Sequence, residues 1–420
     1  MRLLFATRSV RLFAYGLLSV VLVLHLTAAG LGERRIGALF TLTLLGDTAV
    51  SLVITTRADR VGRRAMLAVG AALMVLAAAV FASTTSFALL LVAATVGVIS
   101  PAGGEVGPFL AIEQAALSQS VAGRRRTQVI AWYTLAGALA TALGALAGGT
   151  LAARLQAAGW SALASYRAVI VGYGALGLVL AALFSRLSPG AEAALAPPAA
   201  GGPRLLRVHL GLGRSRAVVL RLASLFAVDA FAGGFVVQAF VAYWFHRRFG
   251  ADPELLGKIF FVANGLAGLS ALSAAWVARR VGLVRTMVFT HLPSNVLLVL
   301  VPLMPTLHLA MAVLFLRFSI SQMDVPTRQS YTVAVVDPGE RSAAGGVTGI
   351  ARSVGASLAP AVAGPLYASP ALAGVPFIVA GALKIVYDVL LYVAFAKLPA
   401  PEERPDPAGG ETRRVPPRHG

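Results

Sequence analysis

Apolar residues occur in long continuous runs along this chain, with short polar stretches between them. A helix that crosses a bilayer core needs about 20 consecutive apolar residues. We expect spanning helices to begin near residues 10, 37, 65, 87, 128, 166, 219, 255, 286, 307, 343 and 373. The pattern therefore predicts an all-α membrane protein with twelve transmembrane helices.

Two stretches lack an apolar run long enough to cross a bilayer. The stretch from Ser185 to Arg216 is rich in Pro, Gly, Ala and Arg, and the stretch after residue 397 is polar and rich in Pro. Such compositions bury too little apolar surface to fold on their own. We therefore predict an N-terminal six-helix bundle over residues 1–185, a cytoplasmic linker over 186–216, a C-terminal six-helix bundle over 217–397 and a disordered cytoplasmic tail over 398–420.

The first apolar run follows a basic start and ends in small residues, which are features of a signal peptide. The next run begins only a few residues later, and many more come after it. We interpret the first run as an uncleaved spanning helix.

Composition excludes several other classes of protein. Only 13% of the residues are charged, against about 25% in soluble domains. The chain has no Cys, and its six His are scattered, so we expect no metal site, no cofactor and no thiol chemistry. The net charge of +19 comes from Arg in short loops, so it does not indicate nucleic acid as a partner. The expected partners are the lipid bilayer, a small-molecule substrate and protons.

The positions of the basic residues orient the helices. Most Arg residues, Arg8 and Arg11 among them, fall in loops on one side of the predicted bilayer. The other side receives only Arg34, Arg35, Arg154, Arg247 and Arg248. Loops rich in Lys and Arg stay in the cytoplasm. We therefore predict a multi-pass protein of the plasma (inner) membrane with both termini in the cytoplasm.

The two halves of the chain echo each other. Three segments of the first half have a similar segment in the second half. ARRVGLVRTM at 278–287 resembles ADRVGRRAM at 58–66, Asp324-Val-Pro resembles Glu105-Val-Gly-Pro, and GERSAA resembles GRRRTQ. All three offsets are close to half the chain length. Such repeats predict two pseudo-symmetric six-helix bundles that rock around a site near the midplane of the membrane.

The first of these loops carries a family signature. Asp59, Arg60, Gly62, Arg63 and Arg64 match the loop between helices 2 and 3 of the major facilitator superfamily, whereas Thr55 replaces the usual leading Gly. By this loop and its twelve-helix plan the chain resembles that superfamily, and three further stretches (GEVGPFLAIEQAALSQ, FTHLPSN and MDVPTRQSYTVAVV) look like a poorly characterised bacterial branch.

The resemblance implies a cytoplasmic gate. Gly62 permits a tight turn, and Asp59 would accept hydrogen bonds from the first turn of the eleventh helix. Glu113 is a candidate partner for Arg60 or Arg63. The alternative is that these arginines only set the topology.

A Gly pattern in the fifth predicted helix gives a weak indication of direction. Antiporters of the superfamily often carry Gly-Pro-x-x-Gly-Gly there, and this chain has Gly144, Gly148 and Gly149 with Ala145 in place of Pro. The resemblance favours export. Close helix packing is the alternative explanation.

Ionisable residues within spanning helices are costly and therefore candidates for function. The sequence places eight of them there, namely Asp47, Glu105, Asp229, Arg317, Asp324, Arg352, Lys384 and Asp388. Lys384 and Asp388 share a helix face, and we interpret them as a pair that neutralises itself. Arg317 and Asp324 also share a face.

Two of the acids adjoin predicted helix breaks. Glu105 follows Pro101, and Asp324 precedes Pro326, at corresponding positions of the two halves. Broken helices at such positions indicate a transport site. We hypothesise that Glu105 and Asp324 face a central cavity and that at least one carries a coupling proton, with Asp229 and Asp47 as further candidates. The alternative is a structural pairing with Arg317, Arg328 or Arg352.

Polar side chains extend the candidate cavity. We assign Gln238, His291 and Asn295 to it, and we expect the segment from His291 to Asn295 to interrupt the ninth helix at its Pro.

The sequence thus predicts a monomeric secondary transporter that works by alternating access, with proton-coupled export of a small molecule as the leading function. Uptake by symport or facilitated diffusion fits the same fold. A sensor or an enzyme is less well supported, because the chain has no sizeable soluble domain and no recognisable catalytic set.

Overall fold

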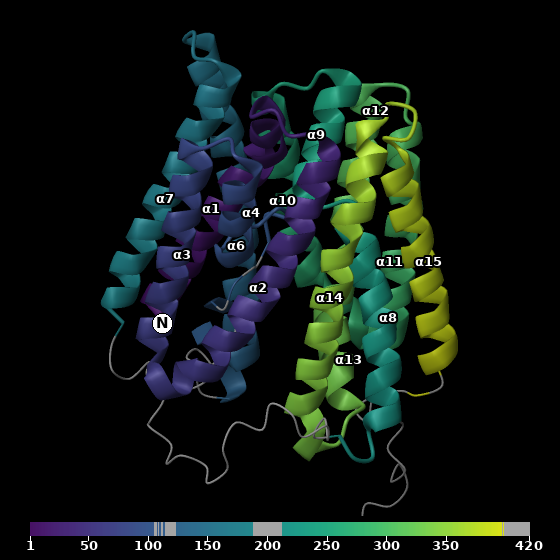
Figure 1. The fold of residues 1–420 in the computed structure, drawn as a ribbon. Coiled ribbons are helices and arrows are strands. Elements are labelled where there is room, and N and C mark those ends of the chain that lie inside the picture. The colour runs from purple at the N-terminus through teal and green to yellow at the C-terminus, as the bar shows by residue number, and fades with distance from the viewer. Residues whose placement is uncertain are drawn as a thin grey trace, which may run out of the picture.

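The computed structural model describes residues 1–104, 107, 109–110, 112–113, 123–187, 212–396 and 398. Every regular element among these residues is a helix (Figure 1). The first half of the chain contains α1 (Arg2–Ala28), α2 (Glu33–Val61), α3 (Arg63–Ser83), α4 (Phe87–Val96), α6 (Gly123–Ala157) and α7 (Ala162–Ser185).

The second half repeats this plan with two broken segments. It contains α8 (Arg216–Gly234), α9 (Gln238–Phe249), α10 (Pro253–Val281), α11 (Leu283–Leu300), η2 (Val301–Leu303), α12 (Leu307–Ile320), α13 (Asp324–Ala334), η3 (Pro338–Glu340), α14 (Arg341–Ala368) and α15 (Val375–Phe395). The pairs α8–α9 and α12–α13 each form one crossing. The predicted linker over 186–216 and tail over 398–420 lie largely outside the described residues.

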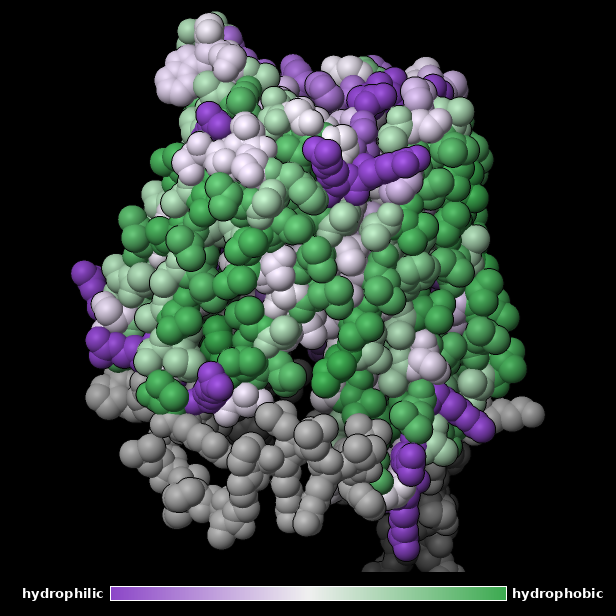
Figure 2. All heavy atoms as spheres, in the orientation of Figure 1, coloured by the Kyte–Doolittle hydropathy of each residue, from purple (hydrophilic) through white to green (hydrophobic). Residues whose placement is uncertain are grey.

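The helices have the length and apolarity of membrane spans. Ten segments among the described residues meet both criteria, and α4 and α14 complete the twelve-helix plan. The surface between the two polar ends is largely apolar (Figure 2). It exposes side chains such as Val92, Leu178 and Val393, which a soluble protein would bury. The predicted all-α membrane fold is confirmed.

The two ends of the molecule differ in the helix connections that they carry. We call the end at which α7 stops and α8 starts the linker face, and the other end, which carries the α1–α2 and α9–α10 connections, the opposite face (Figure 1). At the linker face, Gly62 joins α2 to α3 with φ +111°, and Gly282 joins α10 to α11 with φ +89°. L-residues rarely adopt this backbone conformation, so both turns of the sequence echo require glycine.

Helix breaks occur at three crossings. α4 ends at Val96 before the turn at Pro101, and α12 ends at Ile320 before α13 begins at Asp324, as the sequence indicated. The break between α8 and α9 was not predicted. The expected interruption of the ninth helix is wrong, because Pro293 lies inside a continuous α11. A single Pro removes one backbone bond, which a membrane helix tolerates among its neighbours.

Glycines mark where the two halves cross. A Cβ on Gly37 of α2 would lie 2.3 Å from the carbonyl oxygen of Pro360, and one on Gly149 of α6 would lie 2.1 Å from that of Pro253. Gly144 and Gly148 pack equally closely against α1. Close packing thus accounts for every glycine of the motif that favoured export.

The contact between α2 and α14 of the two halves lies on one side of the membrane. The α2–α14 crossing uses the start of α2 and the last third of α14, near the opposite face. Nearer the linker face, a Cβ on Gly345, Gly346 or Gly349 of α14 would meet no atom of the described residues within 4 Å. The space-filling view shows a hollow between the halves on that side (Figure 2). Among the described residues, α2 and α14 therefore meet near the opposite face and separate toward the linker face.

Candidate functional site: two buried charge clusters

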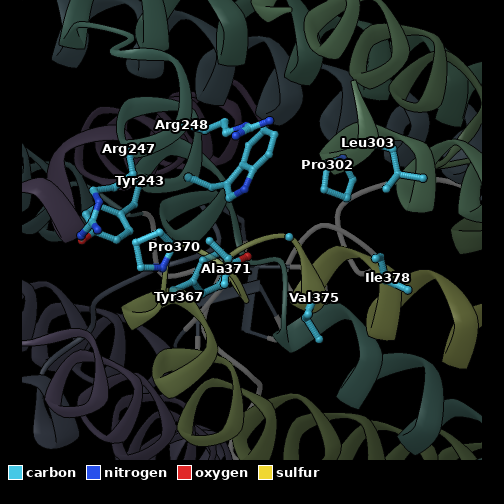
Figure 3. Close-up of a pocket in the computed structure, with 13 residues that line it drawn as sticks. Tyr243, Arg247, Arg248, Pro302, Leu303, Tyr367, Pro370, Ala371, Val375 and Ile378 are labelled. Carbon is cyan, nitrogen blue, oxygen red and sulfur yellow. The ribbon is translucent and has the colours of Figure 1, made fainter. Parts of the chain in front are cut away.

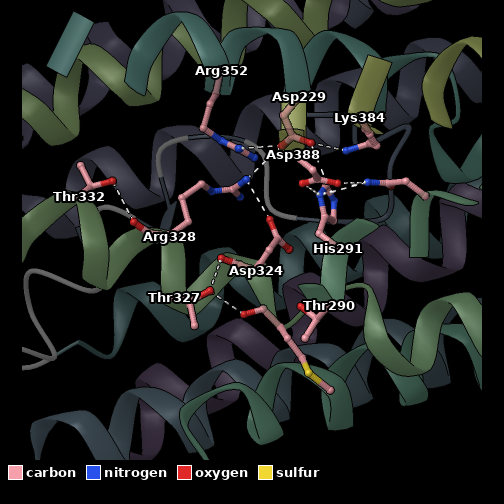
Figure 4. Close-up of polar contacts among 12 residues, drawn as sticks. Asp229, Thr290, His291, Asp324, Thr327, Arg328, Thr332, Arg352, Lys384 and Asp388 are labelled. Atoms are coloured by element: carbon pink, nitrogen blue, oxygen red, sulfur yellow. Dashed lines mark hydrogen bonds and ion pairs between the residues drawn. The ribbon is translucent and has the colours of Figure 1, made fainter. Parts of the chain in front are cut away.

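Five helices of the second half bring polar side chains together inside the bundle (Figure 4). We call this group the C-terminal cluster. It consists of Asp229 on α8, His291 and Asn295 on α11, Asp324 and Arg328 on α13, Arg352 on α14, and Lys384 and Asp388 on α15.

Asp229 is the centre of the cluster. One carboxylate oxygen accepts a hydrogen bond from Lys384 at 2.5 Å, and the other lies 3.0 Å from Arg328 and 3.3 Å from Arg352. The predicted pairing of Lys384 with Asp388 is therefore wrong. α8 packs against α15 and presents a carboxylate that Lys384 reaches directly, a contact between helices that spacing within one helix cannot reveal.

Asp388 has a different set of partners. One of its oxygens lies 2.8 Å from Nδ1 of His291, and the other accepts a hydrogen bond of 2.8 Å from Asn295. Nε2 of His291 lies 4.0 Å from Asp229, so the imidazole stands between two carboxylates. His291 and Asn295 are four residues apart and share a helix face, which was the available sequence signal.

Asp324 lies at the edge of the cluster. Its carboxylate is 3.1 Å from Arg328, which also binds Asp229. Arg352 is the most accessible member, with 37% of its side chain exposed. Arg317, expected on the same face as Asp324, interacts electrostatically with this carboxylate and lies 4.9 Å from the ring of Phe318. Its Nε has no hydrogen-bond partner among the described residues.

The charges of the cluster balance. Asp229, Asp324 and Asp388 face the three cations Arg328, Arg352 and Lys384, and His291 adds a group that can take up one more proton. A buried charge without a partner would be very unfavourable, so any change of protonation must rearrange this network.

A smaller group, which we call the N-terminal cluster, lies inside the first half. Arg11 of α1 binds Glu113 through both ends of its guanidinium, at 2.9 Å each. Glu113 also accepts hydrogen bonds from the hydroxyl groups of Tyr133 of α6 at 2.5 Å and Thr7 of α1 at 2.8 Å. Arg8 stacks over the ring of Tyr133. Arg8 and Arg11, interpreted from the sequence as loop charges that set topology, are almost completely buried.

Several predicted site residues lie elsewhere. Gln238, at the start of α9, donates to Ser19 of α1 at 2.7 Å and accepts from Asn264 of α10 at 3.2 Å, so it joins the two halves. Asp47 of α2 accepts the backbone N–H of Gly107 at 2.7 Å. Neither residue belongs to a charge cluster.

Part of the predicted site cannot be placed. Glu105 and the side chains of Asp59 and Arg60 lie outside the described residues. Of the other arginines in the gate motif, Arg63 is buried and Arg64 is exposed. Glu113, the candidate partner of Arg60 or Arg63, binds Arg11 instead. The gating role of Asp59 and the role of Glu105 stay predictions.

One carboxylate outside the membrane helices ties the second half together at the linker face. Glu340 of η3 accepts the backbone N–H groups of Gly213 at 2.7 Å and Ser215 at 3.1 Å, just before α8. These hydrogen bonds favour the ionised form and lower the pKa of Glu340 below its ordinary value.

Known proteins resemble this chain over most of its length. A family model described as Major Facilitator Superfamily matches residues 4–360. An uncharacterized membrane protein of Saccharomyces cerevisiae, YJR124C, is 30% identical over 420 residues, covering 94% of this chain and 93% of that protein. This relative comes from yeast, so the resemblance is not confined to bacteria.

Solved structures share the fold. The xylose transporter XylE from E. coli, in a partially occluded inward open conformation, gives a TM-score of 0.71 at 13% identity and covers 96% of this chain and 98% of its own. A bacterial homologue of the human lysosomal transporter Spinster, inward-facing and unoccupied, gives 0.67 at 15% identity with 94% of each chain covered. The human organic anion transporter MFSD10 gives 0.56 at 20% identity, covering 93% and 98%.

Proposed function

This chain belongs to the major facilitator superfamily, and we propose that it exports a small molecule in exchange for protons. Family and fold support transport of a small molecule across a membrane. Coupling and direction are the proposed part. The observation that carries the coupling is the balanced, buried C-terminal cluster, in which a proton can be taken up only with a rearrangement of charge.

The surroundings of each acid favour Asp388 and His291 as the proton carriers. Asp229 contacts three cations, so neutralising it would leave all three without their central partner. Asp388 is bound by His291 and Asn295, two side chains that can be neutral. A proton shared between Asp388 and His291 therefore disturbs the fewest ion pairs.

This assignment suggests how a proton could move the helices. A protonated His291 places a positive charge 4.0 Å from Asp229, where it competes with Lys384 and the two arginines. Asp229 then holds Arg328 of α13 and Arg352 of α14 less tightly. Because α14 crosses α2 of the other half, a change at this carboxylate can reach the contact between the bundles.

Asp324 and Glu105 remain candidate residues of the coupling site. Asp324 binds a single cation and can follow the same charge changes through Arg328. Glu105 lies outside the described residues and stays a candidate. The basic loops at the linker face support a cytoplasmic position for that face and for both termini, in the plasma membrane, and we propose a monomer.

Uptake is the second candidate, because a fold of this type also serves symport. One similar structure is described as a D-xylose-proton symporter, with a TM-score of 0.71. Export has only the glycine motif in its favour, and close packing also explains that motif.

Proton movement in inside-out membrane vesicles tests the proposal. The interior is acidified and followed with a pH-sensitive dye while drugs, sugars and amino acids are added one at a time. Proton release from the vesicle upon adding one compound, lost in Asp388→Asn and His291→Gln but kept in Glu254→Gln, supports proton-coupled export. Glu254 is the matched control, since it forms an exposed pair with Lys258 far from the cluster.

Two other outcomes contradict the proposal. Transport of a compound without any proton movement would mean facilitated diffusion. Proton movement that survives in both cluster variants would move the coupling site away from Asp388 and His291.

A further inference from the structure

A pocket of about 460 Å³ opens at the opposite face, at the outer end of the C-terminal bundle (Figure 3). Four residues of α9 line one side, namely Tyr243, Trp244, Arg247 and Arg248. Tyr367 of α14 and apolar residues of η2 and of the α14–α15 connection complete it. Pockets for small molecules have volumes of this order.

The chemistry of the lining selects an anion with an apolar body. Two guanidinium groups line the pocket, and none of its lining residues is acidic. Arg248 lies 5.8 Å from the ring of Phe249 and forms no ion pair with a carboxylate of the described residues. Arginine binds carboxylate and sulfonate groups through paired donors, and the aromatic walls suit an apolar ring.

The pocket shares its walls with the closure of the two bundles. Arg247 binds Glu33 at the start of α2 at 3.0 Å, and Tyr243 donates to the same oxygen at 2.5 Å. Tyr367 stacks on Phe240 with centroids 4.9 Å apart. Phe240 in turn lies 5.1 Å from Phe40 of α2. A ligand in the pocket therefore touches the residues that hold the opposite face closed.

We infer that this pocket is a binding site for a small soluble organic anion, which competes with Glu33 for Arg247 and thereby loosens the closure at the opposite face. The inference concerns binding and closure only. It holds for export or uptake and does not depend on proton coupling, so the two proposals fail separately.

The chain offers a reporter inside the pocket. It has four Trp, of which Trp244 is 2% exposed and lines the pocket, whereas Trp132, Trp160 and Trp276 are 50–58% exposed. Replacing those three by Phe leaves Trp244 as the single Trp of the full chain, which is excited selectively over Tyr in nanodiscs of zwitterionic lipid. Benzoate should change its fluorescence saturably, and the neutral benzyl alcohol should not at the same concentrations.

Three variants separate the parts of the inference. Arg248→Gln should weaken benzoate binding at least fivefold, while Arg285→Gln, an exposed arginine at the linker face, should leave it unchanged. Glu33→Gln should tighten binding severalfold, because Arg247 loses its competing carboxylate.

Four outcomes would contradict the proposed anion site. Equal binding of benzyl alcohol removes the selectivity for anions. Unchanged binding in Arg248→Gln removes the site from this pocket, and unchanged or weaker binding in Glu33→Gln removes the competition. Loss of benzoate binding in nanodiscs of anionic lipid would assign the pocket to a lipid headgroup instead of a soluble anion.

Discussion

The two halves of this transporter place buried polar groups at three corresponding positions, and at two of them the charges are opposite. Arg11 on the first helix of the N-terminal half corresponds to Asp229 in the C-terminal half, 218 residues later. Glu113 corresponds in the same way to Arg328, and Tyr133 to Arg352, at offsets of 215 and 219 residues. Arg11 lies about 14 Å from the start of α1, and Asp229 lies about 20 Å from the start of α8.

The two clusters differ in the number of cations that bind the central carboxylate. Glu113 has one cation, bound through both of its oxygens, and two hydroxyl donors, and both charged side chains are inaccessible. Asp229 has three cations, and α11 and α15 add the pair His291 and Asp388. The cations of the C-terminal cluster can exchange between neighbouring carboxylates, whereas both oxygens of Glu113 hold the same guanidinium. We therefore expect the N-terminal cluster to fix its bundle and the C-terminal cluster to switch.

The largest effect should come from replacing each central pair by apolar residues. Arg11→Met/Glu113→Leu removes both charges, so we expect stability within about 2 kcal/mol of the parent and transport that persists. Asp229→Leu/Lys384→Met takes the carboxylate from Arg352 and leaves Arg328 with Asp324 alone, so we expect little folded protein and no transport. Size-exclusion profiles and substrate flux in vesicles measure both. Equal tolerance of the two double variants would contradict the distinction.

A smaller effect on stability should distinguish the replacement of Glu113 from the replacement of Asp388. Glu113→Gln removes the carboxylate charge that both ends of the buried Arg11 guanidinium bind, and should cost about 3–5 kcal/mol of stability. Asp388→Asn loses hydrogen bonds with groups that can be neutral, and should cost about 1–3 kcal/mol. Unfolding by heat in detergent micelles ranks the two variants. A larger loss in Asp388→Asn would mean that the C-terminal cluster is the fixed one.

The fold could be predicted from sequence because its causes are local. Runs of apolar residues fix the crossings, and the repeated Gly62 and Gly282 fix equivalent turns. Pro101 and Pro326 indicated two helix breaks, but the break before Gln238 carries no Pro and was missed. Pro293 misled in the other direction, since one Pro does not stop a helix that its neighbours support.

The sequence predicts which residues belong to the C-terminal cluster better than it predicts which of them pair with each other. Buried ionisable residues stand out in apolar runs, so Asp229, Asp324 and Asp388 were all identified. Asp324 pairs with Arg328 four residues further along the same helix. The hydrogen-bonded partners of Asp229 and Asp388 come from other helices, between 93 and 155 residues away, and no spacing rule reaches that far. Arg11 was missed because a cation near a helix start looks like a topology signal.

A smaller effect should follow from opening the closure between the halves. Glu33→Gln removes the ion pair with Arg247, whose side chain is 44% exposed, so the change is about 1 kcal/mol or less. Because the chain has no Cys, Ser19→Cys gives a single buried thiol between the halves. We expect a maleimide added at the opposite face to label it a few times faster in Glu33→Gln. Unchanged labelling would place the closure in the glycine crossings alone.

The smallest effect concerns Glu340, which holds the start of α8 in the C-terminal half. Its lowered pKa means that the ionised tether is complete above the ordinary value near 4.5 and is lost as the pH falls through the lower value. Hydrogen exchange at Gly213 and Ser215, corrected for intrinsic rates, should therefore show protection at about pH 6 that is weakened at about pH 3.5. Glu340→Gln should show weak protection at both values. Equal protection in the parent at both pH values would mean that packing around α8, and not this carboxylate, orders the entrance to the switching half.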